Sequence, residues 1–409
     1  MSAQQRESAN VATAKGSSAS PGLMLGLATL GFAVNFWAWA LISPLGPKLK
    51  DSLHLSSFQQ ALIVAVPVIV GALGRIPVGA LTDKLGGRVM FPAVSFAAVV
   101  PVLYLGFSGH SSLGGLLVGG FFLGIAGSSF AVGVPFVSAW FPPERRGLAI
   151  GVFGAGMGGT AISALTTVKL AAAHGVAVPF EITAVALAVY GTLALWLLRD
   201  APHRKLPTEP VLTRLGSAMR LPITWQASAL YAVAFGGYVA FSVYLPTYLK
   251  NGYGLAQSDA ANRMAGFVLL AVVMRPTGGW LSDRFGPVPV LTVVLGIVGI
   301  AAAIQAATPG LVPLGTIAFL TMAGALGAGA GAVFALVAQR SPAGSVGSVT
   351  GVVGAAGGLG GFVPPLLMGS IYGRSGSYGL GLALLSVVAF AATVYALTVA
   401  RRPVAAVAA

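Results

Sequence analysis

The sequence predicts an all-α membrane protein with about twelve transmembrane helices, arranged as two six-helix bundles related by a pseudo-twofold axis. The first observation is composition: 56% of the 409 residues are hydrophobic and only 8% are charged, which is far too apolar for a soluble protein of this length. The second is a series of apolar segments long enough to cross a bilayer. The third is a repeat, because the second half of the chain follows the first in one register.

The predicted spans are apolar runs of about 20 residues or more, the length that crosses a hydrocarbon layer about 30 Å thick. High counts of glycine (57) and proline (25) suit membrane helices that pack closely and bend. The spans are predicted near residues 22–46, 58–82, 88–108, 114–138, 147–170, 176–199, 223–249, 261–283, 286–306, 311–338, 346–370 and 377–400.

The polar segments define the predicted division of the chain. The first apolar run is a full-length helix without a small-residue cleavage site, so no signal peptide is expected. The segments are an N-terminal tail (1–21), a six-helix bundle (22–199), a polar linker (200–222), a second bundle (223–400) and a C-terminal tail (401–409).

The net charge of +14 is explained by membrane orientation rather than by binding to nucleic acid, which is not expected. With a cytoplasmic N-terminus, fifteen of the 23 Lys and Arg residues fall in cytoplasmic segments and five fall outside. We therefore predict a multi-pass protein of the cell inner (plasma) membrane, surrounded by lipid, with both termini and the linker in the cytoplasm.

The repeat has an offset of two hundred residues. The stretch GALGRIPVGALTDKLGGR (71–88) corresponds to MRPTGGWLSDRFGP (274–287), and Lys50 corresponds to Lys250. Glycines of later segments pair in the same register, which indicates a duplicated six-helix unit in parallel order. Substrate sites of such proteins lie between the two halves.

Arg75 and Arg275 are the principal candidates for a binding site. Each lies eight residues before an aspartate at the predicted membrane surface, so helical rise places it about 12 Å deep. The alternative is a structural arginine that snorkels or caps backbone carbonyls. The duplication and the lack of an acidic residue at this depth favour function, because two buried cations without counter-ions require an anion. A guanidinium fork suits a planar oxyanion.

Glycines and aromatic residues at similar depth are further candidates. Close helix packing explains the glycine strips of the fifth and eleventh spans, but a bare backbone also lets a small ligand approach. The aromatic residues could equally be core or lipid-facing. The candidates are Gly154, Gly158, Gly354, Gly358, Phe130, Tyr231 and Phe235.

The pattern Gly-x-x-x-Asp-[Lys/Arg]-x-Gly occurs at the ends of the second and eighth spans, at residues 79–86 and 279–286. It predicts surface loops whose charges pair with helix ends and stabilise one conformation. These gating candidates are Gly79, Asp83, Lys84, Asp283 and Arg284.

No catalytic or metal-binding set is visible, and neither a cofactor nor enzyme activity is expected. The four histidines are scattered, there is no cysteine, and the glycine-rich runs lack the Gly-Lys-Ser/Thr ending of a nucleotide-binding P-loop.

The pattern G-x-x-x-D-[KR]-x-G-[GR]-R after the second of twelve spans resembles the major facilitator superfamily. Within it, the chain is similar to the nitrate/nitrite porter family through the arginines in GRIPVG and MRPTGG and through the glycine signatures GVFGAGMGG and GVVGAAGGLGGFVPP. This resemblance implies that Arg75 and Arg275 hold the anion, that Phe130, Tyr231 and Phe235 sandwich it, and that the glycine signatures line its path.

We therefore predict a secondary transporter of nitrate and/or nitrite that works by alternating access and acts as a monomer. We favour nitrate/nitrite exchange, because no carboxylate or histidine lies at mid-membrane depth. Nitrate/proton symport and exchange of another small or organic anion, such as a phosphate ester, remain alternatives, and a transport-inactive sensor is a further one. The preference between nitrate and nitrite is left open, because the helix 5 signature lacks the polar amide of some family members.

Overall fold

The computed structural model describes residues 20–202, 210–342 and 346–400. All regular elements in these ranges are helices, and twelve of them are long and apolar enough to cross a membrane, as the sequence predicts. Most of both predicted tails, and residues 203–209 of the predicted linker, lie outside the described residues.

The first half of the chain supplies six spans, several of which consist of two consecutive helices. They are α2 (Pro21–Trp39) with α3 (Ile42–Ser52); α4 (Ser57–Leu85); α5 (Gly87–Phe107); α6 (Leu113–Leu123), η2 (Gly124–Ser128) and α7 (Ser129–Trp140); α8 (Pro143–Gly154), η3 (Ala155–Gly158) and α9 (Gly159–His174); and α10 (Ala177–Leu197), with a short η1 (Gly109–Ser111) between the third and fourth.

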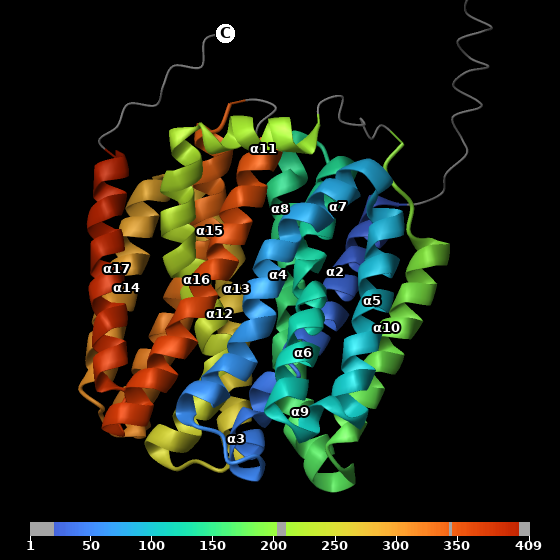
Figure 1. Cartoon of the computed structure of the whole chain (residues 1–409). Helices are drawn as coiled ribbons and strands as arrows, with labels where there is room; N and C mark the ends of the chain where they lie inside the picture. The colour runs from blue at the N-terminus through green and yellow to red at the C-terminus, as the bar shows by residue number, and fades with distance from the viewer. Residues whose placement is uncertain (1–19, 203–209, 343–345, 401–409) are drawn as a thin grey trace, which may run out of the picture.

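The second half supplies the other six spans, preceded by a short helix within the predicted linker. They are α11 (Val211–Met219), which is that short helix; α12 (Pro222–Tyr253); α13 (Gln257–Phe285); α14 (Pro287–Ala306); η4 (Leu311–Gly315) with α15 (Thr316–Arg340); α16 (Val346–Ser375); and α17 (Gly379–Ala400). Figure 1 shows the two halves side by side, with α11 across one end of the bundle and α3 at the other.

Three spans that the sequence analysis treats as continuous helices are interrupted in the structure. The first span breaks between α2 and α3, and short 3₁₀ segments, η2 and η3, divide the fourth and fifth. Both 3₁₀ segments lie in glycine-rich runs, where the helix loses the support of side chains and tightens easily. Periodicity alone does not reveal such breaks, because the apolar pattern continues through them.

The gating candidates lie on helices rather than in loops, which corrects the sequence-based expectation. Helix α4 continues to Leu85 and α13 to Phe285, and each is joined to the next helix by one residue, Gly86 or Gly286. These glycines have φ of 88° and 84°, a region that glycine enters without steric penalty. One residue therefore makes the whole turn, and the charged pairs lie in the last helical turn.

Four helices form most of the contact between the halves: α4 packs along α16, and α9 packs along α13. Glycine permits this close approach. A Cβ on Gly358 would lie 2.6 Å from Cβ of Ala72, and one on Gly369 would lie 2.5 Å from Cβ of Ala61. The glycine strip of α16 therefore brings backbone of one half against the other half.

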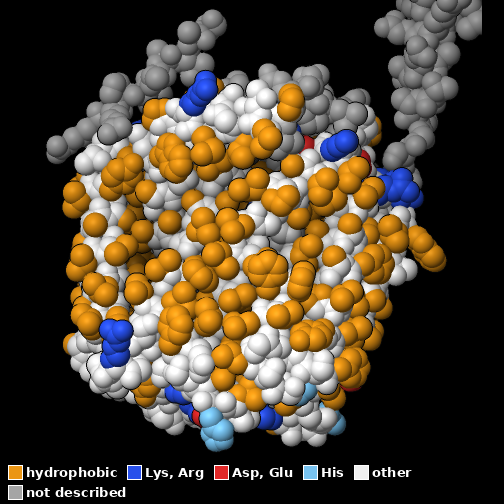
Figure 2. Space-filling model, in the orientation of Figure 1, with side chains coloured by type: hydrophobic (Ala, Val, Ile, Leu, Met, Phe, Trp, Pro, Cys, Tyr) orange, Lys and Arg blue, Asp and Glu red, His pale blue; other side chains and the backbone are white. Residues whose placement is uncertain are grey.

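The surface is that of a membrane protein. Figure 2 shows hydrophobic side chains across the middle of this face, with Lys, Arg and His near the two ends. Large apolar side chains are well exposed, including Phe107 (67%), Val100 (69%) and Trp196 (72%). An apolar belt of this kind is stable only against lipid.

Candidate functional site

Arg75 and Arg275 lie within the apolar stretches of two long helices and reach the interface between the halves. Arg75 lies on α4 and is 8% exposed, and Arg275 lies on α13 and is 7% exposed. The structure thus places both arginines inside the protein rather than at a lipid interface. Charged residues with a function in a membrane protein typically face the interior of the helix bundle in this way.

Each arginine reaches across to the glycine-rich helix of the opposite half. Nη1 of Arg75 donates to the carbonyl oxygen of Gly354 on α16 at 2.6 Å. Nη1 of Arg275 donates to the thioether sulfur of Met157 in η3. In its own half, Nη2 of Arg275 donates to the hydroxyl of Tyr231 at 3.1 Å. These acceptors are all neutral, so none of them compensates either positive charge.

Arg75 retains an unused donor. Its Nε is buried and has no hydrogen-bond partner among the described residues. The ion pairs of the described chain, Arg214–Asp83, Lys250–Asp51 and Arg263–Asp259, include neither Arg75 nor Arg275. An unpaired donor on a buried cation is unfavourable, and a bound anion would satisfy both the donor and the charge.

Two aromatic rings are shared by the arginines. Cζ of Arg75 is 5.4 Å from the Phe130 ring centroid and 5.6 Å from that of Phe235. Cζ of Arg275 is 5.7 Å and 5.6 Å from the same two centroids. Tyr231 stacks on Phe235 at 4.8 Å. The three predicted aromatic residues are therefore brought together with both arginines, and the two shared rings lie within cation–π distance of both guanidinium groups.

Three of the four candidate glycines border the arginines. A Cβ on Gly154 would lie 3.8 Å from Arg275, and one on Gly358 would lie 3.5 Å from Nη1 of Arg75. Gly354 supplies the carbonyl that Arg75 contacts, and its Cβ would lie 3.9 Å from Phe130. Gly158 faces open space instead, with nothing within 4 Å.

The gating candidates lie at the end of the bundle that carries α11. Asp83, which is half-buried, accepts from Nη2 of Arg214 on α11 at 2.9 Å, so the helix of the linker is held to α4. Arg284 packs over the rings of Trp280 and Phe285 on its own helix. Lys84, Asp283 and Arg284 are exposed, and Gly79 lies beside Ala131 of α7.

Three contributing residues were missed in the sequence. Phe334 lies 5.7 Å from Cζ of Arg275 and 4.9 Å from the Tyr231 ring. It lies one helical turn beyond Ala330, the repeat equivalent of Phe130, so a search one turn to either side could have found it. Met157 was more weakly indicated by the sequence, as a long side chain among the glycines of GVFGAGMGG. Arg214 had none, because nothing indicated that the linker contains a helix.

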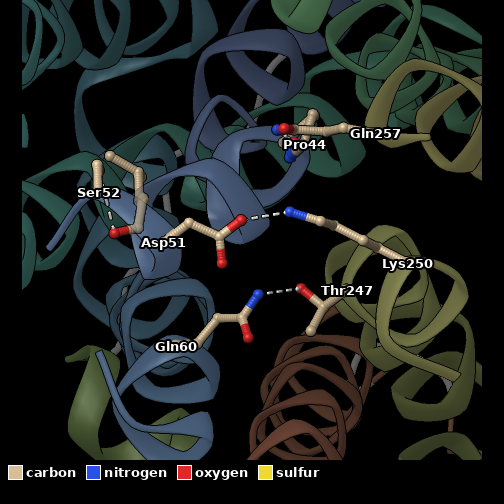
Figure 3. Close-up of polar contacts among 8 residues, drawn as sticks. Pro44, Asp51, Ser52, Gln60, Thr247, Lys250 and Gln257 are labelled. Atoms are coloured by element: carbon tan, nitrogen blue, oxygen red, sulfur yellow. Dashed lines mark hydrogen bonds and ion pairs between the residues drawn. The ribbon is translucent and has the colours of Figure 1, made fainter. Parts of the chain in front are cut away.

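The opposite end of the bundle, the predicted external end, is closed by bonds between the halves (Figure 3). The buried amide Nε2 of Gln60 donates to Oγ1 of Thr247 at 3.0 Å. Lys250 pairs with Asp51, and Nε2 of Gln257 donates to the carbonyl of Pro44 at 2.7 Å. These contacts hold the two halves together at this end.

Comparison with known proteins agrees with this architecture. The sequence model of the Major Facilitator Superfamily matches residues 28–365, and matches again over 263–408. The chain belongs to the Major Facilitator Superfamily. The chain also has the fold of solved transporters of this shape. A bacterial homologue of the human lysosomal transporter Spinster, in an inward-facing and occupied conformation, superposes with a TM-score of 0.73 at 19% identity, covering 94% of this chain and 98% of that one.

Curated relatives of this Major Facilitator Superfamily protein are named as transporters, so the chain is a transporter and not an enzyme. It is 49% identical over 380 residues to the "Probable nitrate/nitrite transporter NarK2" of Mycobacterium tuberculosis H37Rv (92% of this chain, 96% of the relative). The "Nitrite extrusion protein" of Bacillus subtilis is 36% identical (91% and 93%). The "Probable nitrate transporter NarT" of Staphylococcus haemolyticus is 34% identical (90% and 94%).

Proposed function

We propose that this Major Facilitator Superfamily protein transports nitrate and nitrite, and that the anion binds between Arg75 and Arg275. The observation that carries the proposal is the unpaired, buried Nε of Arg75 beside a second uncompensated guanidinium. Two convergent cations in a low-dielectric interior attract one monovalent anion strongly. The names of the relatives support nitrate and nitrite as that anion.

The surroundings favour a small planar ion. Phe130 and Phe235 each contact both guanidinium groups, and the space beside them is bounded by backbone at Gly154 and Gly354. A planar oxyanion can lie against an aromatic face while its oxygens accept from guanidinium forks at its edges. Each of these rings lies 5.4–5.7 Å from both Cζ atoms, so the two cations are held close together, which suits a small ion better than a large organic anion or a phosphate ester. Because all these groups come from one chain, the proposed working unit is a monomer.

We propose alternating access as the mechanism, with the observed state closed toward the outside. The bonds between Gln60 and Thr247 and between Asp51 and Lys250 join the halves at the predicted external end. Breaking these contacts would let the halves rock apart there and expose the arginines from that side. At the other end, Asp83 and Arg214 hold α11 against α4 and are proposed to restrain the opposite movement.

Replacing Thr247 by valine should favour the outward-open state. In the closed state Thr247→Val leaves the amide of Gln60 buried without its acceptor, and opening returns that amide to water. The chain has no cysteine, so Gly46→Cys, beside Gln60 and Thr247, provides a unique label site. We expect a membrane-impermeant maleimide to react about fivefold faster in the Thr247→Val background, since one hydrogen bond contributes about 1 kcal/mol.

The matched control is Thr183→Val. Thr183 is also fully buried, but its hydroxyl donates to Pro179 within its own helix. Labelling of Gly46→Cys should be unchanged in this control. Equal labelling rates in the Thr247→Val variant and in the control would contradict the proposed external closure.

We propose that transport is an exchange of nitrate for nitrite. An empty site leaves two like charges facing each other in a medium of low dielectric, so the halves should rearrange more slowly without an anion. Proteoliposomes loaded with nitrite should therefore take up labelled nitrate at least about tenfold faster than vesicles without internal anion, if the empty site adds about 1.4 kcal/mol to the barrier. Uptake is measured at equal pH on both sides.

The alternatives give different results in the same vesicles. Nitrate/proton symport would give robust uptake into anion-free vesicles driven by a pH gradient alone, and this result would exclude obligatory exchange. Competition by an organic anion or a phosphate ester as strong as that by nitrite would favour a wider substrate range. Absence of nitrate and nitrite uptake under every condition would contradict the proposed function itself.

A further inference from the structure

Met157 places a sulfur atom against one of the two arginines. It lies in η3, the 3₁₀ segment that interrupts the fifth span, and its side chain is 3% exposed. Its thioether accepts an N–H from Nη1 of Arg275, across the interface between the halves. The contact thus belongs to the cluster around the two arginines, although the resemblance to the porter family did not indicate it.

The repeat shows that this sulfur is a feature of one half only. The equivalent of Met157 in the second half is Gly357, where a Cβ would lie 2.3 Å from Cδ1 of Tyr231, so the ring occupies the position of a side chain. Arg75 correspondingly donates to a backbone carbonyl, that of Gly354. The two arginines therefore both use acceptors from the opposite half, but only the acceptor of Arg275 belongs to a side chain that a substitution can remove.

A thioether is a hydrogen-bond acceptor that an anion can displace. It is neutral and a much weaker acceptor than an oxyanion, so an anion beside Arg275 takes the N–H from it. A methionine side chain has three rotatable bonds and repacks readily. The segment around it carries little side-chain bulk: a Cβ on Gly154, one turn earlier, would have atoms of Arg275 as its nearest neighbours, at 3.8 Å.

We infer that Met157 is a displaceable acceptor that occupies Nη1 of Arg275 in the empty site and is replaced there by the transported anion. This inference rests on the proposed function. It makes Met157 a residue that sets affinity: the stronger the acceptor at position 157, the weaker the binding of the anion, because the anion must first break the contact.

Nitrate titration of the purified full-length protein, by isothermal calorimetry in lipid nanodiscs, tests this inference. Met157→Leu keeps the volume of the side chain but removes the acceptor, so Arg275 gains more when nitrate binds. We expect the Kd for nitrate to fall about tenfold, as for one hydrogen bond to a charged group. Met157→Gln supplies a stronger acceptor and should raise the Kd by a similar factor.

The matched control is Met24→Leu. Met24 is fully buried, and its sulfur accepts the backbone N–H of Arg199, far from the arginines of the site. The Kd of the Met24→Leu variant for nitrate should equal that of the unmodified protein. If the Leu variant does not fold, Met157→Ala, which also removes the sulfur, provides the test.

A Kd that is unchanged in Met157→Leu, or raised by it, would overturn the inference, since the first indicates simple packing and the second a favourable contact with the anion. Failure of the proposed function gives a different result, because the unmodified protein would then bind neither nitrate nor nitrite.

Discussion

Nitrate uptake should be lost when Arg275 or Arg75 is replaced by lysine. Arg275 now divides its donors among Met157, Tyr231 and the proposed anion, and a single ammonium cannot serve these directions together. Lysine keeps the charge but loses the guanidinium fork, and each hydrogen bond to a charged group contributes about 1.5–3 kcal/mol, so losing two of them costs about 3 kcal/mol or more. We therefore expect uptake by proteoliposomes to fall more than about 100-fold in each variant.

The control for this experiment is Arg263→Lys, on the same helix as Arg275. Arg263 is exposed, and its Nε contacts Asp259 one turn away, a pairing that lysine can maintain at the surface. Uptake by this variant should match that of the unmodified protein. Membrane insertion and helical content, measured by circular dichroism, should be the same in all variants. Normal uptake in both Arg75→Lys and Arg275→Lys would remove the proposed site.

Much of this arrangement could be predicted because it is expressed locally in the sequence. Apolar runs identify the spans, and the spacing of Arg75 from Asp83, repeated at Arg275 and Asp283, gives the depth of both charges. The duplication then indicates that the charges converge, since repeated halves meet face to face. The structure brings these two arginines and three predicted aromatic residues together.

The rest could not be predicted because it depends on partners that are far away in the chain. Whether Met157 or Gly158 borders Arg275 depends on the rotation of η3, and the sequence contains no sign of a 3₁₀ segment there. The pairing of Asp83 with Arg214 requires the short helix α11, whose nine residues lie within the predicted linker. Both features arise only when segments distant in the chain pack together.

Helix packing beside Arg275 gives the second large expected effect. A Cβ on Gly331 of α15 would lie 2.1 Å from the carbonyl oxygen of Arg275 and 3.1 Å from the amide nitrogen of Gly279. Backbone atoms cannot swing aside as side-chain ends do, so Gly331→Ala must separate α15 from α13. We expect a loss of stability of about 1–3 kcal/mol or more from overpacking, seen as a lower midpoint of thermal unfolding.

Transport should suffer beyond this loss of stability, because the strain falls on the backbone of Arg275 itself and displaces its guanidinium from Phe130 and Phe235. Gly266→Ala tests this reasoning on the same helix, since its added Cβ would have nothing within 4 Å. That variant should be as stable as the unmodified protein or slightly more stable, because alanine favours helix over glycine by about 1 kcal/mol. If Gly331→Ala behaves like Gly266→Ala in unfolding and in uptake, then the close approach of α15 does not position Arg275.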